Sequence, residues 1–198
     1  MKIVIAGGSG FIGKNLTEYL IKEGHEVTIL TRTKRKVSTT VSYVSWLKEG
    51  SAPENELGNV DVFINLAGVS INEGSWSKKH QEQIYHSRMS ATDELIRIIT
   101  ALPQKPSALI NASATRVYPT SVEAVYTEES HMIADDFLGK TVHEWENKAK
   151  EVDKLGVRCV LLRFGVVLGN EAGALPLMGL PYKFFVCGRV GSGKQWVS

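Results

Sequence analysis

The chain is poor in the residues and patterns that mark several classes of protein. It has two cysteines in 198 residues, Cys159 and Cys187, and neither lies in a Cys-x-x-Cys or cysteine–histidine spacing. This excludes a disulfide scaffold and predicts reduced thiols and no metal site. No apolar run reaches membrane-spanning length, because Arg158 and Arg163 interrupt the stretch Val157–Leu168. We therefore expect a cytoplasmic protein that does not enter a membrane.

The chain also lacks an excess of charge of either sign. It carries 23 Lys and Arg against 21 Asp and Glu, a formal net charge of +2, and its longest basic block is the short run Arg32–Lys36. This balance argues against a nucleic-acid-binding surface. The first apolar stretch begins at residue 2, so we expect no secretory signal. The length predicts one domain, or one domain and a fragment of a second.

The feature that organises the rest is a glycine-rich stretch near the start. Lys2–Ala6 is β-branched and apolar, as in a buried parallel strand, and Asn15–Glu23 has helical spacing with Leu16, Tyr19 and Leu20 on one face. Strand, glycine turn and helix are the order of a dinucleotide site, in which free N–H groups around Gly8–Ile12 face a pyrophosphate. A glycine turn without a ligand is the alternative. The predicted cofactor contacts in this stretch are Gly7, Gly10, Phe11, Ile12 and Gly13.

The end of the second predicted strand, Glu26–Thr31, indicates which cofactor is preferred. NAD-binding proteins place an acid here to accept from the ribose 2′-hydroxyl. This chain has instead Thr31 and Arg32, followed by Lys34 and Arg35. A guanidinium can bind a 2′-phosphate, whereas a carboxylate would repel it. We therefore expect NADP(H) in preference to NAD(H), the alternative being a solvated basic loop.

The remaining pattern alternates strands with helices, which predicts an α/β fold: a Rossmann doubly wound parallel sheet with helices on both faces and strand order 3-2-1-4-5-6. Residues 1–169 form the predicted NADP(H)-binding domain. From residue 170 on, glycines and prolines break the pattern, and we expect 170–198 to begin a substrate-binding portion of a truncated chain. The predicted later strands are Val41–Trp46, Asp61–Leu66, Ala108–Ala112 and Val157–Arg163; the predicted helices are Ser77–Leu102 and Leu138–Leu155, with a turn or short helix at Pro53–Asn59 and a loop at Thr115–Phe137.

Four segments resemble one protein family. They are GGSGFIG at Gly7–Gly13, the NxAG stretch Asn65–Gly68, the pair Trp145-Glu146, and RFGVVLG at Arg163–Gly169. Together they resemble the atypical and extended short-chain dehydrogenase/reductases of the NAD-dependent epimerase/dehydratase superfamily. The closest resemblance is to the epimerase-family group of unknown substrate that lacks a Tyr-x-x-x-Lys motif. The resemblance implies cofactor contacts at the end of the fourth strand, from Leu66, Ala67 and Gly68.

The resemblance also implies where an active site would lie. Reductases of this superfamily use an Asn–Ser–Tyr–Lys set, in which Ser113 fits the serine and would also touch the cofactor. The Tyr and Lys positions fall on Leu138 and Val142, and the Asn position falls on Arg88. Two further positions depart from the group's pattern: Ser75 stands where Arg is expected, and Arg116 where Gly is expected.

With the usual pair missing, other groups are candidates for acid–base work. Tyr118 lies five residues after Ser113, and we treat both as candidate catalytic residues, with a packing role as the alternative for Tyr118. His143 and Glu144 point about 100° and 200° away from Val142 on an ideal helix. Asp135-Asp136 has the pattern of a helix N-cap. A serine alone could only polarise a carbonyl.

These observations leave two functional hypotheses. The first is an NADP(H)-binding short-chain reductase or epimerase-like enzyme that acts on a small carbonyl or a nucleotide-sugar-like compound. The second is a non-catalytic NADP(H)-binding protein with a regulatory or structural function. We expect a small-molecule substrate as the main partner and, as a protein partner, at most a second copy in a homodimer.

Overall fold

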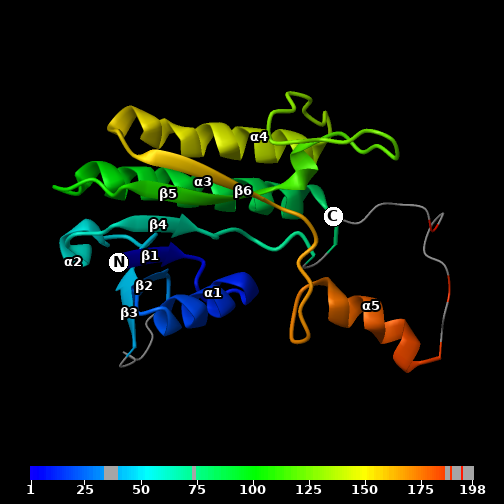
Figure 1. Ribbon diagram of the computed structural model, residues 1–198, viewed down its shortest axis with the longest axis horizontal. Helices are drawn as coiled ribbons and strands as arrows, with labels where there is room; N and C mark the ends of the chain where they lie inside the picture. The colour runs from blue at the N-terminus through cyan, green and yellow to red at the C-terminus, as the bar shows by residue number, and fades with distance from the viewer. Residues whose placement is uncertain (34–39, 73–74, 186–187, 189–192, 194–198) are drawn as a thin grey trace.

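A computed structural model describes residues 1–33, 40–72, 75–185, 188 and 193. Its centre is a six-stranded parallel sheet in the order β3-β2-β1-β4-β5-β6, which confirms the predicted order (Figure 1). The strands are β1 (Lys2–Ala6), β2 (Glu26–Thr31), β3 (Val41–Ser45), β4 (Val62–Asn65), β5 (Ala108–Ala114) and β6 (Arg158–Phe164). The helices are α1 (Phe11–Lys22), α2 (Glu54–Leu57), α3 (Lys78–Ala101), α4 (Phe137–Ala149) and α5 (Ala174–Lys183), with 3₁₀ turns η1 (Thr115–Val117) and η2 (Lys150–Leu155).

Helix α1 covers one face of the sheet. Its side chains Leu16, Leu20 and Ile21 pack against a cluster of buried residues from β1, β2 and β4: Ile3, Ile5, Val27, Ile29 and Ile64. The prediction that Tyr19 belongs to the inner face is wrong, because its side chain is 60% exposed. The buried side of α1 is centred on Gly13 and Thr17, and Tyr19 lies about 200° around the helix from Thr17.

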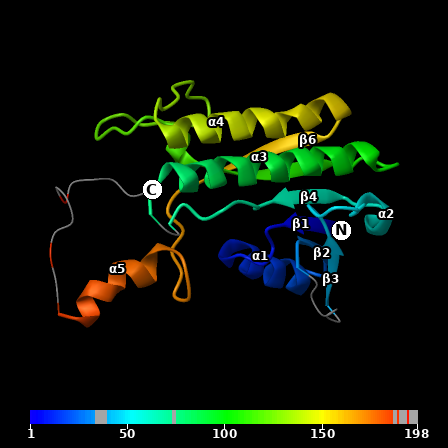
Figure 2. The same ribbon diagram turned by 180° about the vertical axis from the view of Figure 1, so that it is seen from behind.

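Helices α3 and α4 lie side by side over the opposite face (Figure 2). The long helix α3 begins at its N-cap Ser77, whose hydroxyl accepts from the His80 N–H, and it contributes Leu95, Ile98 and Ile99 to the larger core cluster. The helical pattern predicted for Leu138–Leu155 is α4 followed by η2, which ends at Gly156 with φ +75°. This packing leaves the carboxyl ends of the strands uncovered by these helices.

The chain after β6 contains a helix that the sequence pattern does not predict. Gly173 precedes α5, in which Pro176 lies in the first turn, where a backbone N–H has no intrahelical partner to lose. Pro181 lies in the last turn, so it interrupts little of the helix. Helix α5 stands apart from the sheet in both views, and Leu175, Met178 and Tyr182 are exposed.

Two further properties concern what the described residues do not contain. None of the helices in that part of the chain combines the length and the apolar composition needed to cross a membrane. Over the same residues, His, Cys, Asp and Glu side chains form no group of three or more that could hold a metal ion.

Candidate functional site

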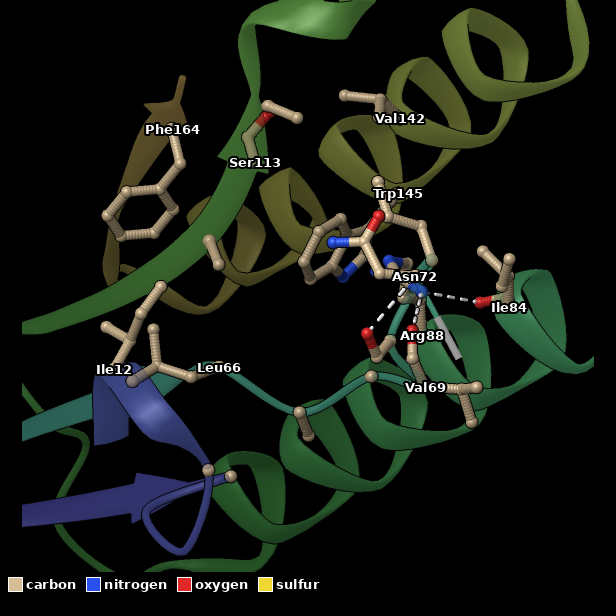
Figure 3. Close-up of a pocket in the computed structure, with 18 of the residues that line it drawn as sticks. Ile12, Leu66, Val69, Asn72, Ile84, Arg88, Ser113, Val142, Trp145 and Phe164 are labelled. Carbon is tan, nitrogen blue, oxygen red and sulfur yellow. Dashed lines mark hydrogen bonds between the residues drawn. The ribbon is translucent and has the colours of Figure 1, made fainter. Parts of the chain in front are cut away.

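A cavity of about 590 Å³ lies at the carboxyl ends of the strands. The glycine turn and the end of β4 form one part of its wall, and the end of β5 and helices α3 and α4 form the other. In Figure 3, Ile12 and Leu66 lie at one end of this space, and Ser113 and Val142 lie at the other. The cavity therefore joins the predicted cofactor turn to the predicted serine.

The glycine turn has the geometry that close approach of a ligand requires. Gly7 has φ +80°, and its carbonyl accepts from the Gly10 N–H at 3.0 Å. A side chain on Gly13 would collide with Gly7 O and would lie 2.6 Å from Gly8 Cα. A Cβ on Gly10, which lines the cavity, would in contrast meet only Gly7 O, at 3.4 Å.

Gly10 is also the N-cap of α1, and no side chain caps this helix. The first N–H groups of a helix have no intrahelical acceptor. At the start of α1 these are the N–H groups of cavity-lining residues Phe11, Ile12 and Gly13. An uncapped helix N-terminus over a side-chain-free turn is a suitable place for a phosphate group.

Buried amides hold the end of β4 in place. Asn65 is fully buried; its Oδ1 accepts from the Ala67 N–H at 3.1 Å, and its Nδ2 donates to Asn111 Oδ1 at 2.7 Å and to Thr92 Oγ1 at 3.1 Å. Trp145 Nε1 donates to the same Thr92 hydroxyl at 2.9 Å. The network ties β4, β5, α3 and α4 together beneath the cavity, and it shapes the wall formed by Leu66, Ala67 and Gly68.

Ser113 lies near the end of β5, lines the cavity and is otherwise buried. Its hydroxyl donates a hydrogen bond to Glu146 Oε1 on α4. Glu146 is 2% exposed and accepts from Arg163 Nε and from a terminal guanidinium nitrogen, both at 2.8 Å. Burial alone would raise the pKa of Glu146, but the hydrogen bonds from Arg163 and Ser113 outweigh it, and the net effect is a lowered pKa. The carboxylate is therefore ionised at neutral pH.

Tyr118 is not brought to the cavity. Its hydroxyl donates to Thr127 O at 2.6 Å and accepts from Arg163, whose guanidinium lies 5.1 Å from the ring centre. The ring stacks on Tyr126 at 5.0 Å. Tyr118 thus holds Arg163 through the terminal nitrogen that does not bond to Glu146.

The positions of the missing Tyr–Lys pair do face the cavity. Leu138 and Val142 both line it, one turn apart on α4, and Figure 3 shows Val142. The neighbouring polar groups point elsewhere: His143 bonds to Asn147, and Glu144 accepts from the Tyr85 hydroxyl at 2.6 Å. The described lining contains two titratable residues, Arg88 and Arg116, and neither can act as an acid or base near neutral pH.

Arg88 is a cation in the cavity wall without a carboxylate partner among the described residues. One terminal nitrogen donates to Val69 O at 3.1 Å and Ile84 O at 3.0 Å, and the guanidinium lies 5.3 Å from the Trp145 ring centre. Burial lowers the pKa of Arg88, although an arginine remains protonated at neutral pH. Its charge is available to an acidic ligand group.

The two departures from the family pattern differ in their surroundings. Arg116 lines the cavity and pairs with Asp136, while it also donates to Thr120 Oγ1 at 3.0 Å. Asp136 is the N-cap of α4, where its other oxygen accepts from the Gly139 N–H at 2.8 Å, as predicted. Ser75 is exposed.

Thr31 and Arg32 lie at the end of β2 and are not among the residues that line the cavity. Arg32 is exposed, and the Thr31 hydroxyl donates to Thr33 O at 3.0 Å. Lys34, Arg35 and Lys36 fall outside the described residues. The structure brings together the glycine turn, the β4 end and Ser113, and it leaves the predicted 2′-phosphate contacts at the periphery.

Glu146 and Arg163 belong to the candidate site, although neither was predicted from the sequence as a site residue. Both belong to segments noted only for their family resemblance. The sequence signal that could have identified them is the position of Glu146 on the predicted inner face of a helix. Its neighbours on that face, Trp145 and Ala149, are apolar and buried. Such a glutamate needs a cationic partner.

Known proteins similar to this chain cover most or all of its length. The family model described as the NAD dependent epimerase/dehydratase family matches residues 3–175. The epimerase family protein YfhF of Bacillus subtilis is 48% identical over 199 aligned residues, which cover 100% of this chain and 65% of that protein. The chain thus spans about two thirds of the length of this relative.

Solved structures of similar proteins share the fold. Human epimerase family protein SDR39U1, crystallised with NADPH, has a TM-score of 0.85 and 33% identity, with 100% of this chain and 64% of that chain covered. The nucleoside-diphosphate sugar epimerase of Corynebacterium glutamicum has a TM-score of 0.81 and 30% identity, with 100% and 40% covered. Because the family model matches most of the chain, the chain belongs to the NAD dependent epimerase/dehydratase family.

Proposed function

We propose that the chain binds NADP(H) across the cavity, with the pyrophosphate on the turn Gly7–Gly13. The observation that carries this proposal is the uncapped N-terminus of α1 above a turn whose Gly10 presents no side chain to the cavity. The human relative crystallised with NADPH, which shares the fold at 33% identity, supports the same assignment. The residues present fit a dinucleotide.

The preference for NADP(H) over NAD(H) rests on Arg32. It is an exposed cation that follows β2, and the strand ends in Thr31 rather than in an acid. A guanidinium free in solvent can turn toward a 2′-phosphate and bind it in bidentate fashion.

We further propose that the chain takes part in hydride transfer on a small substrate that carries an acidic group. The bound cofactor would supply or accept the hydride. Ser113 would hold the reacting oxygen of the substrate, and Arg88 would hold its acidic group, because the guanidinium has no carboxylate partner in the described cavity wall. The name of the similar Corynebacterium protein, a nucleoside-diphosphate sugar epimerase, supports a substrate with such groups.

A non-catalytic NADP(H)-binding function is the second candidate. The specific observation in its favour is the apolar pair Leu138 and Val142, which occupies the wall positions where the superfamily resemblance places the acid–base pair. A protein of this kind would bind the cofactor and turn it over slowly or not at all.

Residues 170–198 would begin a substrate-binding portion. Ala172 and Gly173 reach the cavity, while Leu175, Met178 and Tyr182 on α5 are exposed. We place the protein in the cytoplasm, where Cys159 would stay a thiol. Burial raises the pKa of this cysteine to about 11, which makes it unreactive. A homodimer is the protein assembly that we propose to test first.

The experiment is a titration of the purified protein with NADPH and NADH, followed by NADPH oxidation with a panel of neutral and acidic carbonyl compounds. We expect NADPH to bind more tightly than NADH and acidic carbonyls to be the better substrates. Binding without oxidation of NADPH by any member would favour the non-catalytic function. Absence of NADPH binding would overturn the proposal.

A further inference from the structure

The direction of one hydrogen bond decides what Ser113 can offer a ligand. A serine hydroxyl has one proton and two lone pairs. The Ser113 proton is committed to Glu146 Oε1, because an ionised carboxylate can only accept. The lone pairs are then the part of this hydroxyl that remains for the cavity.

Arg163, the other hydrogen-bond partner of Glu146, keeps this carboxylate ionised, so that it can only accept hydrogen bonds. Both of its oxygens accept from Arg163, and its side chain is 3% exposed. Arg163 is in turn fixed by the Tyr118 hydroxyl and by the position of its guanidinium over the Tyr118 ring. Rotation of the Ser113 hydroxyl toward the cavity would leave the buried Oε1 with one donor fewer, which costs free energy.

Among the cavity-lining side chains of α4 and β6, Thr141 carries a hydroxyl, Trp145 donates its N–H to Thr92, and the other three offer no donor. Leu138, Val142 and Phe164 are apolar and donate no hydrogen bonds. A carbonyl oxygen placed against Ser113 would face the lone pairs of this hydroxyl, whereas a hydroxyl group would donate to Ser113 Oγ.

We propose that Ser113 accepts a hydrogen bond from the ligand, so that the end of the cavity lined by Ser113 and Val142 selects an alcohol over the corresponding ketone. Glu146 is a positioning residue that acts through Ser113. The inference rests on the proposed function, since it assumes that the ligand shares the cavity with NADP(H). It differs from the expectation that Ser113 polarises a carbonyl, which would require the proton that Glu146 holds.

The test measures binding of cyclohexanol to the NADPH complex and of cyclohexanone to the NADP⁺ complex. Neither combination can transfer a hydride. The affinity of each probe is compared between the wild-type protein and its variants, always with the same cofactor. The difference in charge between NADPH and NADP⁺ therefore does not enter the comparison. The double variant Glu146→Met with Arg163→Met removes the whole ion pair and leaves no buried charge behind. It frees the Ser113 proton for the ligand.

In the double variant, we expect cyclohexanone to bind about fivefold to tenfold more tightly, the worth of one hydrogen bond, and cyclohexanol to change little, because Ser113 Oγ keeps its lone pairs. Ser113→Ala should weaken cyclohexanol alone by the same factor. Glu144→Gln is the matched control on the same helix, because its carboxylate bonds to Tyr85 and does not line the cavity. It should change neither affinity.

The outcomes separate the inference from the proposed function. Loss of NADPH binding in the wild-type protein would count against the proposed function. If NADPH binds and Ser113→Ala weakens cyclohexanone rather than cyclohexanol, Ser113 donates and the inference is overturned. The same conclusion follows if neither probe binds to the wild-type complexes, or if both probes shift together in the double variant. Ser113→Ala keeps the test decisive even if the double variant does not fold.

Discussion

Arg163 and Glu146 form a two-pronged ion pair: the Nε and one terminal nitrogen of the arginine each lie 2.8 Å from a carboxylate oxygen. The pair joins β6 to α4 directly behind Ser113, and the side chains of the arginine and the glutamate are 21% and 3% exposed. Because the pair is buried, loss of one partner should lower the free energy of unfolding strongly.

Removal of Arg163 alone should destabilise the protein strongly. Arg163→Met leaves the Glu146 charge buried without its partner, and such a loss costs about 3–5 kcal/mol of unfolding free energy. The double variant Glu146→Met with Arg163→Met should cost much less, because no charge remains. Urea unfolding followed by circular dichroism measures both. Equal losses in the single and double variants would show that the pair is not effectively buried.

Acid should destabilise the protein partly through Glu54. The hydrogen bonds that this residue accepts from Arg97 tie α2 to α3 and lower its pKa from 4.5 to about 2. A lowered pKa in the folded state stabilises the protein above pH 4.5, and this contribution is lost as the pH falls toward 2. Glu54→Gln should therefore flatten the decline of unfolding free energy over this range. Glu56→Gln, an exposed neighbour outside the described ion pairs, should leave the decline as steep as in the wild type.

Two glycines of the turn should respond differently to valine. Gly10→Val places a side chain where the pyrophosphate would lie, so NADPH binding should be lost while the melting temperature stays close to that of the wild type. Gly13→Val forces a side chain against Gly7 O and Gly8 Cα, so the fold itself should be damaged. Thermal unfolding and NADPH titration separate the two effects. Normal NADPH affinity in Gly10→Val would place the phosphates elsewhere.

Arg32→Asp should reverse or flatten the preference for NADPH over NADH. Loss of a charge-assisted phosphate contact costs on the order of 1.5–3 kcal/mol, or roughly tenfold to a hundredfold in affinity. Titration calorimetry with both cofactors measures the preference. Arg158→Asp is the matched control, since Arg158 is also exposed but starts β6 at the opposite end of the sheet. Equal wild-type affinities for the two cofactors would contradict the assignment.

Leu138→Tyr combined with Val142→Lys should create an acid–base pair in the cavity. The two positions lie one turn apart on α4 and both line the cavity. A nearby ammonium group lowers the pKa of a phenol. We expect faster NADPH oxidation with simple ketones than in the wild type. Leu138→Phe with Val142→Met, similar in size but without titratable groups, should show no gain.

The sequence by itself determined the order of elements and predicted the place of the candidate site. Parallel strands separated by helices have few arrangements, and buried β-branched runs identify the strands, so the order 3-2-1-4-5-6 and the glycine turn at its centre were predictable. The N-cap at Asp136 and the apolar replacements Leu138 and Val142 were predictable as well, because each depends on local spacing or on the match to a motif.

The tertiary structure decided which polar groups meet. Tyr118 is close to Ser113 in the chain, but η1 turns it away from the cavity and onto Arg163. Glu146 and Arg163 lie 33 and 50 residues beyond Ser113 in the chain and still meet behind it. Such contacts follow from how β5, β6 and α4 pack, and spacing along the sequence does not encode them. The direction of the Ser113 proton, and with it the chemistry that this residue can offer, exists only once those elements are assembled.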